Sequence, residues 1–130
     1  MRKILLNRLE VNENSLPYII AEVGVNHENS IEKAFELIDL AKEGGANAVK
    51  FQTYKAEKIA SVNSPSYWDL SEVPTKTQYK LFKKYDHFGE DEYIKLANYS
   101  NKIGIEFIST PFDIEAVDFL DPIMNFYKVA

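Results

Sequence analysis

A chain of 130 residues can bury a hydrophobic core, and 45% hydrophobic with 27% charged residues is typical of a folded globular domain. The formal net charge of −5 argues against a nucleic-acid-binding protein, because such proteins usually present a basic face to the phosphates. The lack of cysteine excludes disulfides and thiolate chemistry, and no apolar run approaches the roughly 20 residues that span a bilayer. We therefore expect a cytoplasmic protein that binds neither nucleic acid nor membrane.

The first predicted elements form a small N-terminal unit. A strand at Lys3–Leu9 meets a polar turn at Asn12–Asn14, and together they predict a β-hairpin lid over residues 1–17. The next strand, Tyr18–Gly24, is almost continuously apolar, as expected for a parallel strand covered by helices.

A helix and a second apolar strand follow. Apolar residues recur at helical spacing over Ser30–Glu43, Asn29 and Glu32 resemble a capping box, and Gly44-Gly45 supplies a stop. The strand predicted after this helix is Ala48–Thr53.

A long polar and aromatic stretch, Tyr54–Phe88, interrupts the alternation. We expect it to be a loop excursion with one short helix at about Lys76–Tyr85. Tyr67-Trp68 could pack on a sugar, but an anchor for the loop is the favoured interpretation. Another helix is expected from Gly89 to just before Gly104.

The last predicted elements are a strand at Ile105–Thr110, a short helix capped by Asp113 and a fourth strand at Phe126–Ala130. Strands that alternate with helices predict an α/β fold with a parallel sheet. The first turn has only one glycine, Gly24, so the phosphate fingerprint of an open doubly wound sheet is missing and a TIM barrel is favoured. Because a complete barrel needs about 250 residues, residues 18–130 would supply its first four strands with their helices.

Alternation of side chains along each strand predicts a shared polar site. Glu22, Lys50, Gln52, Thr110 and Lys128 would all lie on the face opposite the helices, close to the carboxyl ends of the strands. Active sites of TIM barrels form at that rim. Two ammonium groups and a hydroxyl suit a small dianion such as a phosphate, and a carboxylate could orient a hydroxyl-rich substrate or transfer a proton.

For any one of these residues alone, an internal salt bridge would be the simpler explanation, but four successive strands that follow one rule favour function. Asn26 and His27, just past the first strand, could bind substrate or simply fix a turn. His27 and His87 are the only two histidines, which is too little to predict a metal site, and His87 is interpreted as structural or exposed.

Four ordered blocks of sequence resemble the N-acetylneuraminate (sialic acid) synthase family: Ile20–His27, Ala48–Thr53, Phe107–Asp113 and Phe126–Ala130. The resemblance implies condensation of phosphoenolpyruvate with N-acetylmannosamine or a related N-acylated amino-sugar, to give a sialic-type nonulosonic acid and phosphate. It further implies a homodimer as the intact enzyme, with the rest of the barrel and a C-terminal antifreeze-like domain outside this chain, so the fragment alone is expected to be inactive.

The same resemblance implies roles for individual residues. Glu22 and Lys50 are the expected catalytic residues, and Lys50 would contact the phosphoenolpyruvate anion. Thr110 and Lys128 would hold phosphate, and Gln52 would lie where the two substrates meet. A divalent metal ion, manganese or magnesium, would polarise the acceptor aldehyde, with ligands on later strands that this chain does not contain.

Two other functions remain open from the residues alone. A pyruvate-type aldolase with a phosphate ligand would use a strand lysine as a Schiff base. A non-catalytic half-barrel would instead serve as an assembly unit, because an unclosed sheet leaves its edges unpaired.

Overall fold

The computed structural model of the chain describes residues 2–130, which form two small sheets, five α-helices and one 3-10 turn. Within these residues, no helix has both the length and the apolar character needed to cross a membrane. The elements in chain order are β1 (Lys3–Leu6), β2 (Leu9–Asn12), β3 (Ile20–Gly24), α1 (Ile31–Glu43), β4 (Ala48–Thr53), α2 (Ala56–Ile59), α3 (Gln78–Tyr85), α4 (Glu90–Ile103), β5 (Glu106–Pro111), α5 (Ile114–Leu120) and η1 (Asp121–Ile123).

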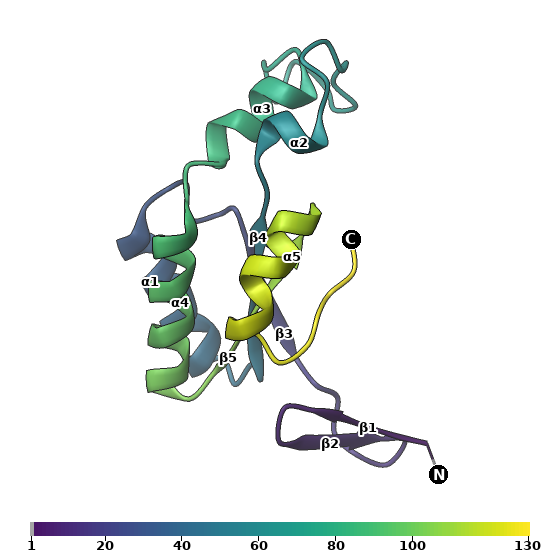
Figure 1. Cartoon of the computed structure of the whole chain (residues 1–130), viewed down its shortest axis with the longest axis vertical. Coiled ribbons are helices and arrows are strands. Elements are labelled where there is room, and N and C mark those ends of the chain that lie inside the picture. Colours follow the sequence, from purple (N-terminus) through teal and green to yellow (C-terminus); the bar gives the residue numbers. More distant parts are fainter. Residues whose placement is uncertain (1) are drawn as a thin grey trace.

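The larger sheet contains β3, β4 and β5 in that order, and all three strands run parallel (Figure 1). Glu22 lies opposite Lys50 in the register of β3 with β4, and Gln52 lies opposite Thr110 in the register of β4 with β5. Parallel strands require long crossovers, and α1 and α4 lie in the segments that connect these strands. The predicted α/β fold with a parallel sheet is confirmed.

One face of this sheet forms the hydrophobic core. Val49 and Phe51 of β4 and Phe107 of β5 are at most 4% exposed, and they belong to one cluster with Ile38 of α1 and Leu96 of α4. Each such side chain gains about 1.5–3 kcal/mol from leaving water. The predicted strand alternation therefore correctly identifies the face that the helices cover.

The helix ends confirm two predicted caps and correct a third. Asp113 Oδ1 accepts a hydrogen bond from Ala116 N at 2.8 Å and so caps α5, and Gly104 ends α4 with a φ of 76°. The cap of α1, however, is Ser30, whose Oγ accepts from Lys33 N at 3.1 Å. The predicted cap, Asn29, instead has a φ of 63°, which asparagine tolerates better than most residues.

The N-terminal hairpin is present, but its turn lies elsewhere in the sequence. β1 and β2 pair antiparallel around Asn7 and Arg8, so the strand predicted as Lys3–Leu9 is divided in two. Asn7 has a φ of 53°, which permits a tight turn. Its side-chain amide donates to Glu106 at the beginning of β5. The hairpin thus lies beside the amino-terminal ends of the strands, opposite the rim where the polar site is predicted (Figure 1).

The long excursion between β4 and α4 is more ordered than the sequence suggests. Helix α3 matches the predicted helix within two residues at its start, but α2 was not predicted. Trp68 Nε1 donates to the carbonyl oxygens of Val73 and Thr75, both at 3.1 Å. The expectation that this tryptophan anchors the loop is therefore confirmed.

The fourth predicted strand, Phe126–Ala130, is wrong for this structure. These residues have no regular secondary structure and leave the sheet as an extended tail (Figure 1). One reason lies at the outer edge of β5, where Ser109 N donates to the Met124 sulfur at 2.9 Å instead of to a strand carbonyl. A side chain thus occupies a donor that a fourth strand would need.

Candidate functional site

The predicted polar site is centred on an ion pair between neighbouring strands. The Lys50 ammonium of β4 contacts the Glu22 carboxylate of β3, and these residues are opposite each other in the register. The Lys50 side chain is only 13% exposed and Glu22 is 49% exposed. A lysine so nearly buried needs a charged partner. Because the Glu22 carboxylate is half exposed, a molecule in solution can reach the ion pair.

Gln52 and Gly24 complete this side of the site. A Cβ atom added to Gly24 would lie 3.2 Å from Glu22 Oε1 and 3.7 Å from Gln52 Nε2, so these two side chains converge above the glycine. Gly24 also has a φ of 55° and follows a register shift in β3, and both features disfavour a larger residue. The sequence folds locally so that a carboxylate and an amide meet.

Thr110 joins the group from β5. It is 2% exposed, lies opposite Gln52 in the register, and its Oγ1 has no hydrogen-bond partner among the described residues. Two other buried atoms, His27 Nε2 and Ser100 Oγ, are also unpartnered there, but neither residue belongs to the polar face of the sheet. A buried hydroxyl without a hydrogen-bond partner lowers the stability of the fold. The Thr110 hydroxyl can therefore donate a hydrogen bond to an acceptor atom of a ligand or to a water molecule. We name Glu22, Lys50, Gln52 and Thr110 the strand-end cluster.

Lys128 does not join the strand-end cluster. It was expected to reach the rim from a fourth strand, but it lies exposed in the extended tail that follows η1. Without a strand there is no alternation to direct its side chain. The structure thus brings four of the five predicted strand residues to one face.

His27 is also placed differently from the prediction of a substrate contact. It is 1% exposed and stacks on Phe88 with ring centroids 4.1 Å apart, and it lies close to Phe51 on the helix-covered face. Its Nδ1 accepts from Asn29 N at 3.1 Å, and burial lowers the pKa of the imidazole to about 4. His27 is therefore a neutral histidine within the hydrophobic core at neutral pH. Asn26, by contrast, is exposed in the loop after β3, and its role as a substrate contact stays a prediction.

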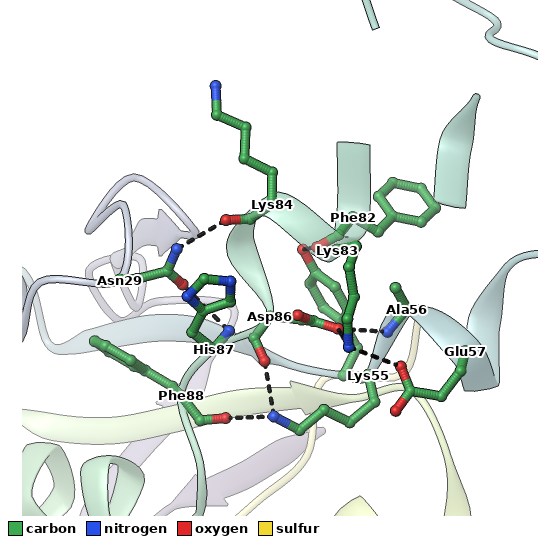
Figure 2. A network of polar contacts seen from close by, with 11 residues as sticks. Asn29, Lys55, Ala56, Glu57, Phe82, Lys83, Lys84, Asp86, His87 and Phe88 are labelled. Carbon is green, nitrogen blue, oxygen red and sulfur yellow. Dashed lines mark hydrogen bonds and ion pairs between the residues drawn. The ribbon is translucent and has the colours of Figure 1, made fainter. Parts of the chain in front are cut away.

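A polar network holds the end of the excursion against the strand rim, and it was not predicted (Figure 2). Lys55 Nζ donates to the carbonyl oxygens of Asp86 and Phe88 at 2.7 and 2.9 Å, and the buried Asp86 carboxylate accepts from Ala56 N at 2.9 Å. From the β3–α1 loop, Asn29 Nδ2 donates to the Lys84 carbonyl at 2.8 Å. The only sequence signal was Asn29, which resembled a cap.

Among residues 2–130, no three side chains of His, Cys, Asp or Glu gather into a set that could hold a metal ion. The strand-end cluster contains a single carboxylate, and Lys50 already pairs with it. The metal ion implied by the family resemblance therefore has no ligand set among these residues.

Comparison with known proteins gives consistent results. A family model described as the NeuB family matches residues 37–130. N,N'-diacetyllegionaminic acid synthase from Legionella pneumophila is 44% identical over 105 residues, which covers 79% of this chain and 29% of that protein. N-acetylneuraminate-9-phosphate synthase from Homo sapiens is 33% identical over 113 residues, which covers 86% of this chain and 32% of that protein.

A solved structure agrees with these sequence matches. The sialic acid synthetase from Leptospira borgpetersenii, determined in complex with citrate, superposes with a TM-score of 0.74 at 32% identity and covers 94% of this chain and 38% of that one. The chain thus spans about a third of the length of the proteins it matches. On the family match over residues 37–130, together with these relatives, the chain belongs to the NeuB family.

Proposed function

We propose that the complete protein condenses phosphoenolpyruvate with N-acetylmannosamine or a related N-acylated amino-sugar to give a nonulosonic acid and inorganic phosphate. Similar proteins carry the names of legionaminic, pseudaminic and sialic acid synthases, which supports this class of reaction. The observation that carries the proposal is the strand-end cluster, where an ammonium and an unpartnered hydroxyl lie on one face of three parallel strands.

In this reaction the methylene carbon of phosphoenolpyruvate forms a bond to the aldehyde carbon of the sugar. Water supplies the new oxygen at C2, and phosphate leaves by cleavage of its bond to that carbon. The compact positive charge of Lys50 would bind the phosphoenolpyruvate anion. The Thr110 hydroxyl would donate a hydrogen bond to one of the phosphoenolpyruvate oxygens. Gln52 would lie between the two substrates.

Glu22 is the group suited to proton transfer or to orienting the sugar hydroxyls. Its carboxylate is half exposed, so a substrate can reach it, and the contact with Lys50 keeps it beside the donor. Charges fixed in place before the substrates arrive need no costly reorganisation as the reaction proceeds.

The wider organisation belongs to the same proposal. Strands β3–β5 would begin a TIM barrel, with residues 1–17 as a separate hairpin unit. The intact enzyme would be a cytoplasmic homodimer that uses manganese or magnesium through ligands outside residues 2–130.

The test is a reaction of the complete protein with phosphoenolpyruvate and a panel of N-acylated amino-sugars. Phosphate release that depends on the sugar, with a product whose mass equals both carbon skeletons joined, is the expected result. Borohydride with pyruvate should leave no covalent adduct. An adduct on a strand lysine, or pyruvate-dependent chemistry without phosphate release, would replace this proposal with a Schiff-base aldolase.

A further inference from the structure

One side chain of the polar network at the strand rim makes two hydrogen bonds to the backbone of a distant segment. Asn29, in the loop between β3 and α1, donates from Nδ2 to the Lys84 carbonyl at 2.8 Å and accepts at Oδ1 from His87 N at 3.2 Å (Figure 2). Both ends of one amide are thus used on a segment that lies 55 to 58 residues further along the chain. We refer to these two hydrogen bonds as the Asn29 brace.

The backbone at Asn29 shows that the side chain, and not the turn alone, gives this position its purpose. Glu28 and Asn29 have φ values of 51° and 63°, a region that glycine adopts freely and most other residues rarely. Glycine would therefore form the turn at least as well. A non-glycine residue keeps such a conformation where the surrounding contacts determine it, and the Asn29 amide makes contacts that glycine cannot make.

The loop before Asn29 connects the brace firmly to the end of β3. Consecutive backbone hydrogen bonds of 2.9–3.0 Å close three overlapping turns between Val23 and Ser30. Within them, Asn29 N donates to Nδ1 of the buried His27 at 3.1 Å. Because the loop is a series of closed turns, a displacement of Asn29 would be passed on to the end of β3.

The segment at the other end of the brace is fixed to the chain that follows β4. Lys55 Nζ donates to the carbonyl oxygens of Asp86 and Phe88 at 2.7 and 2.9 Å. Tyr93 of α4, a few residues further on, donates its hydroxyl to the Gln52 carbonyl at 2.7 Å. Residues 84–88 therefore join the end of β3 to the end of β4.

The sheet by itself constrains the end of β3 less than it constrains the neighbouring strands. The register of β3 with β4 shifts between Glu22 and Gly24, whereas β4 pairs with β5 without interruption over Ala48–Thr53. Such a shift disrupts the hydrogen-bond ladder locally. Glu22 lies beside this irregularity, while Lys50 and Thr110 lie in the uninterrupted pairing.

We propose that Asn29 is a positioning residue for Glu22, because its brace holds the end of β3, and with it the Glu22 carboxylate, against Lys50 and Gln52. This inference rests on the proposed function, in which Glu22 orients the amino-sugar or transfers a proton. Loss of the brace should therefore impair use of the sugar. It should spare the binding of phosphoenolpyruvate by Lys50 and Thr110.

The experiment begins with Asn29→Gly in the complete protein, which removes the brace but suits the left-handed backbone. The value of kcat/KM for the amino-sugar should fall roughly 10- to 100-fold, because a small misplacement of a reacting group can cost about 100-fold in rate. KM for the sugar should rise, and KM for phosphoenolpyruvate should stay the same. A smaller fraction of folded enzyme would lower kcat alone, so a selective rise in KM identifies positioning.

Two further variants separate the amide from the backbone. Asn29→Asp keeps the acceptor for His87 N but lacks the donor to the Lys84 carbonyl, so its kinetics should lie between those of the wild type and Asn29→Gly. Glu28→Gly is the matched control, because Glu28 also has a positive φ but is exposed and pairs with Lys33. This control should keep the wild-type kinetics.

Hydrogen exchange tests the brace independently of the reaction. The backbone amide of His87 donates to Asn29 Oδ1 and belongs to an exposed residue. It should therefore exchange faster in Asn29→Gly than in the wild type or in Glu28→Gly.

Two failures can be told apart. If the wild type forms a nonulosonic acid but Asn29→Gly keeps its KM for the sugar, or Glu28→Gly loses as much activity, this inference is overturned. Unchanged exchange of the His87 amide in Asn29→Gly would overturn it as well. If the wild type releases no phosphate with any amino-sugar, the proposed function itself fails, and the role of Asn29 fails with it, whatever the exchange rate of His87.

Discussion

Two neighbouring hydroxyl groups on β5 show how differently the two faces of the parallel sheet are built. Ser109 faces the helices, is fully buried, and shares a hydrogen bond of 2.7 Å with Thr53 of the adjacent strand. Thr110 is the next residue, points to the other face, and is equally buried, yet its Oγ1 has no partner among the described residues.

The difference teaches that the polar residues of this sheet serve two purposes. On the helix-covered face the Ser109 and Thr53 hydroxyls satisfy each other, although His27 Nε2, also buried on that side, has no partner among the described residues. On the opposite face Lys50, Gln52 and Thr110 retain unused or accessible hydrogen-bonding capacity, which lowers stability unless a ligand completes it. The first face should therefore determine stability and the second activity.

The largest expected effect is on the helix-covered face. Phe51 is fully buried and stacks on Phe107 with ring centroids 5.7 Å apart. Phe51→Ala should lower the free energy of unfolding by about 3–5 kcal/mol, because it leaves a cavity in the core. Urea denaturation of the complete protein measures this, and a loss below about 1 kcal/mol would show that the two faces do not differ as described.

At Lys50, one residue before Phe51, a substitution is expected to reduce activity rather than stability. Lys50→Met should reduce kcat/KM for phosphoenolpyruvate at least roughly 100-fold, since it removes a fixed positive charge from the donor site. Its effect on stability should stay below about 1 kcal/mol, because the half-exposed Glu22 can be hydrated instead. Retained activity, or a loss of stability like that of Phe51→Ala, would contradict the comparison.

His27 provides a pH-dependent test of the helix-covered face. Its pKa is about 4 in the folded protein and 6.5 in the unfolded chain, so the unfolded state binds a proton first as the pH falls. Stability from the neutral imidazole is complete above pH 6.5 and is lost toward pH 4, on the order of 3 kcal/mol in total. Unfolding free energies measured across this range should show the loss.

The only other histidine gives the control for that experiment. His87 is exposed, so His87→Gln should keep the wild-type pH dependence, whereas His27→Gln should flatten it. The same loss of stability in both variants would mean that another group titrates in this range.

The sequence predicted the parallel sheet and most of the site because both depend on local patterns. Alternation along Ala48–Thr53 is enough to place the side chains of Lys50 and Gln52 on one face of the strand and that of Phe51 on the other. This holds whatever the rest of the fold is. The Asp113 cap and the glycine end of α4 are likewise encoded within a few residues.

The errors arose where distant contacts decide the structure. A strand exists only if its neighbour offers free hydrogen-bonding groups, and Met124 occupies one at the edge of β5, so Lys128 has no strand to direct it. Asn29 resembles a cap locally, but its amide contacts Lys84 at the end of α3, 55 residues away in sequence. No periodicity in residues 54–88 predicts the contacts that Lys55 and Asp86 make.

The smallest expected change tests the central claim most directly, and it concerns Thr110. Isothermal titration calorimetry of phosphoenolpyruvate with the complete protein compares the wild type with Thr110→Val, which keeps the shape but removes the hydroxyl. The variant should bind roughly 10-fold more weakly while its unfolding free energy stays the same or rises, since the lost hydroxyl had no partner to lose. Equal affinity of both proteins for phosphoenolpyruvate would contradict a phosphoenolpyruvate-binding site on this face of the sheet.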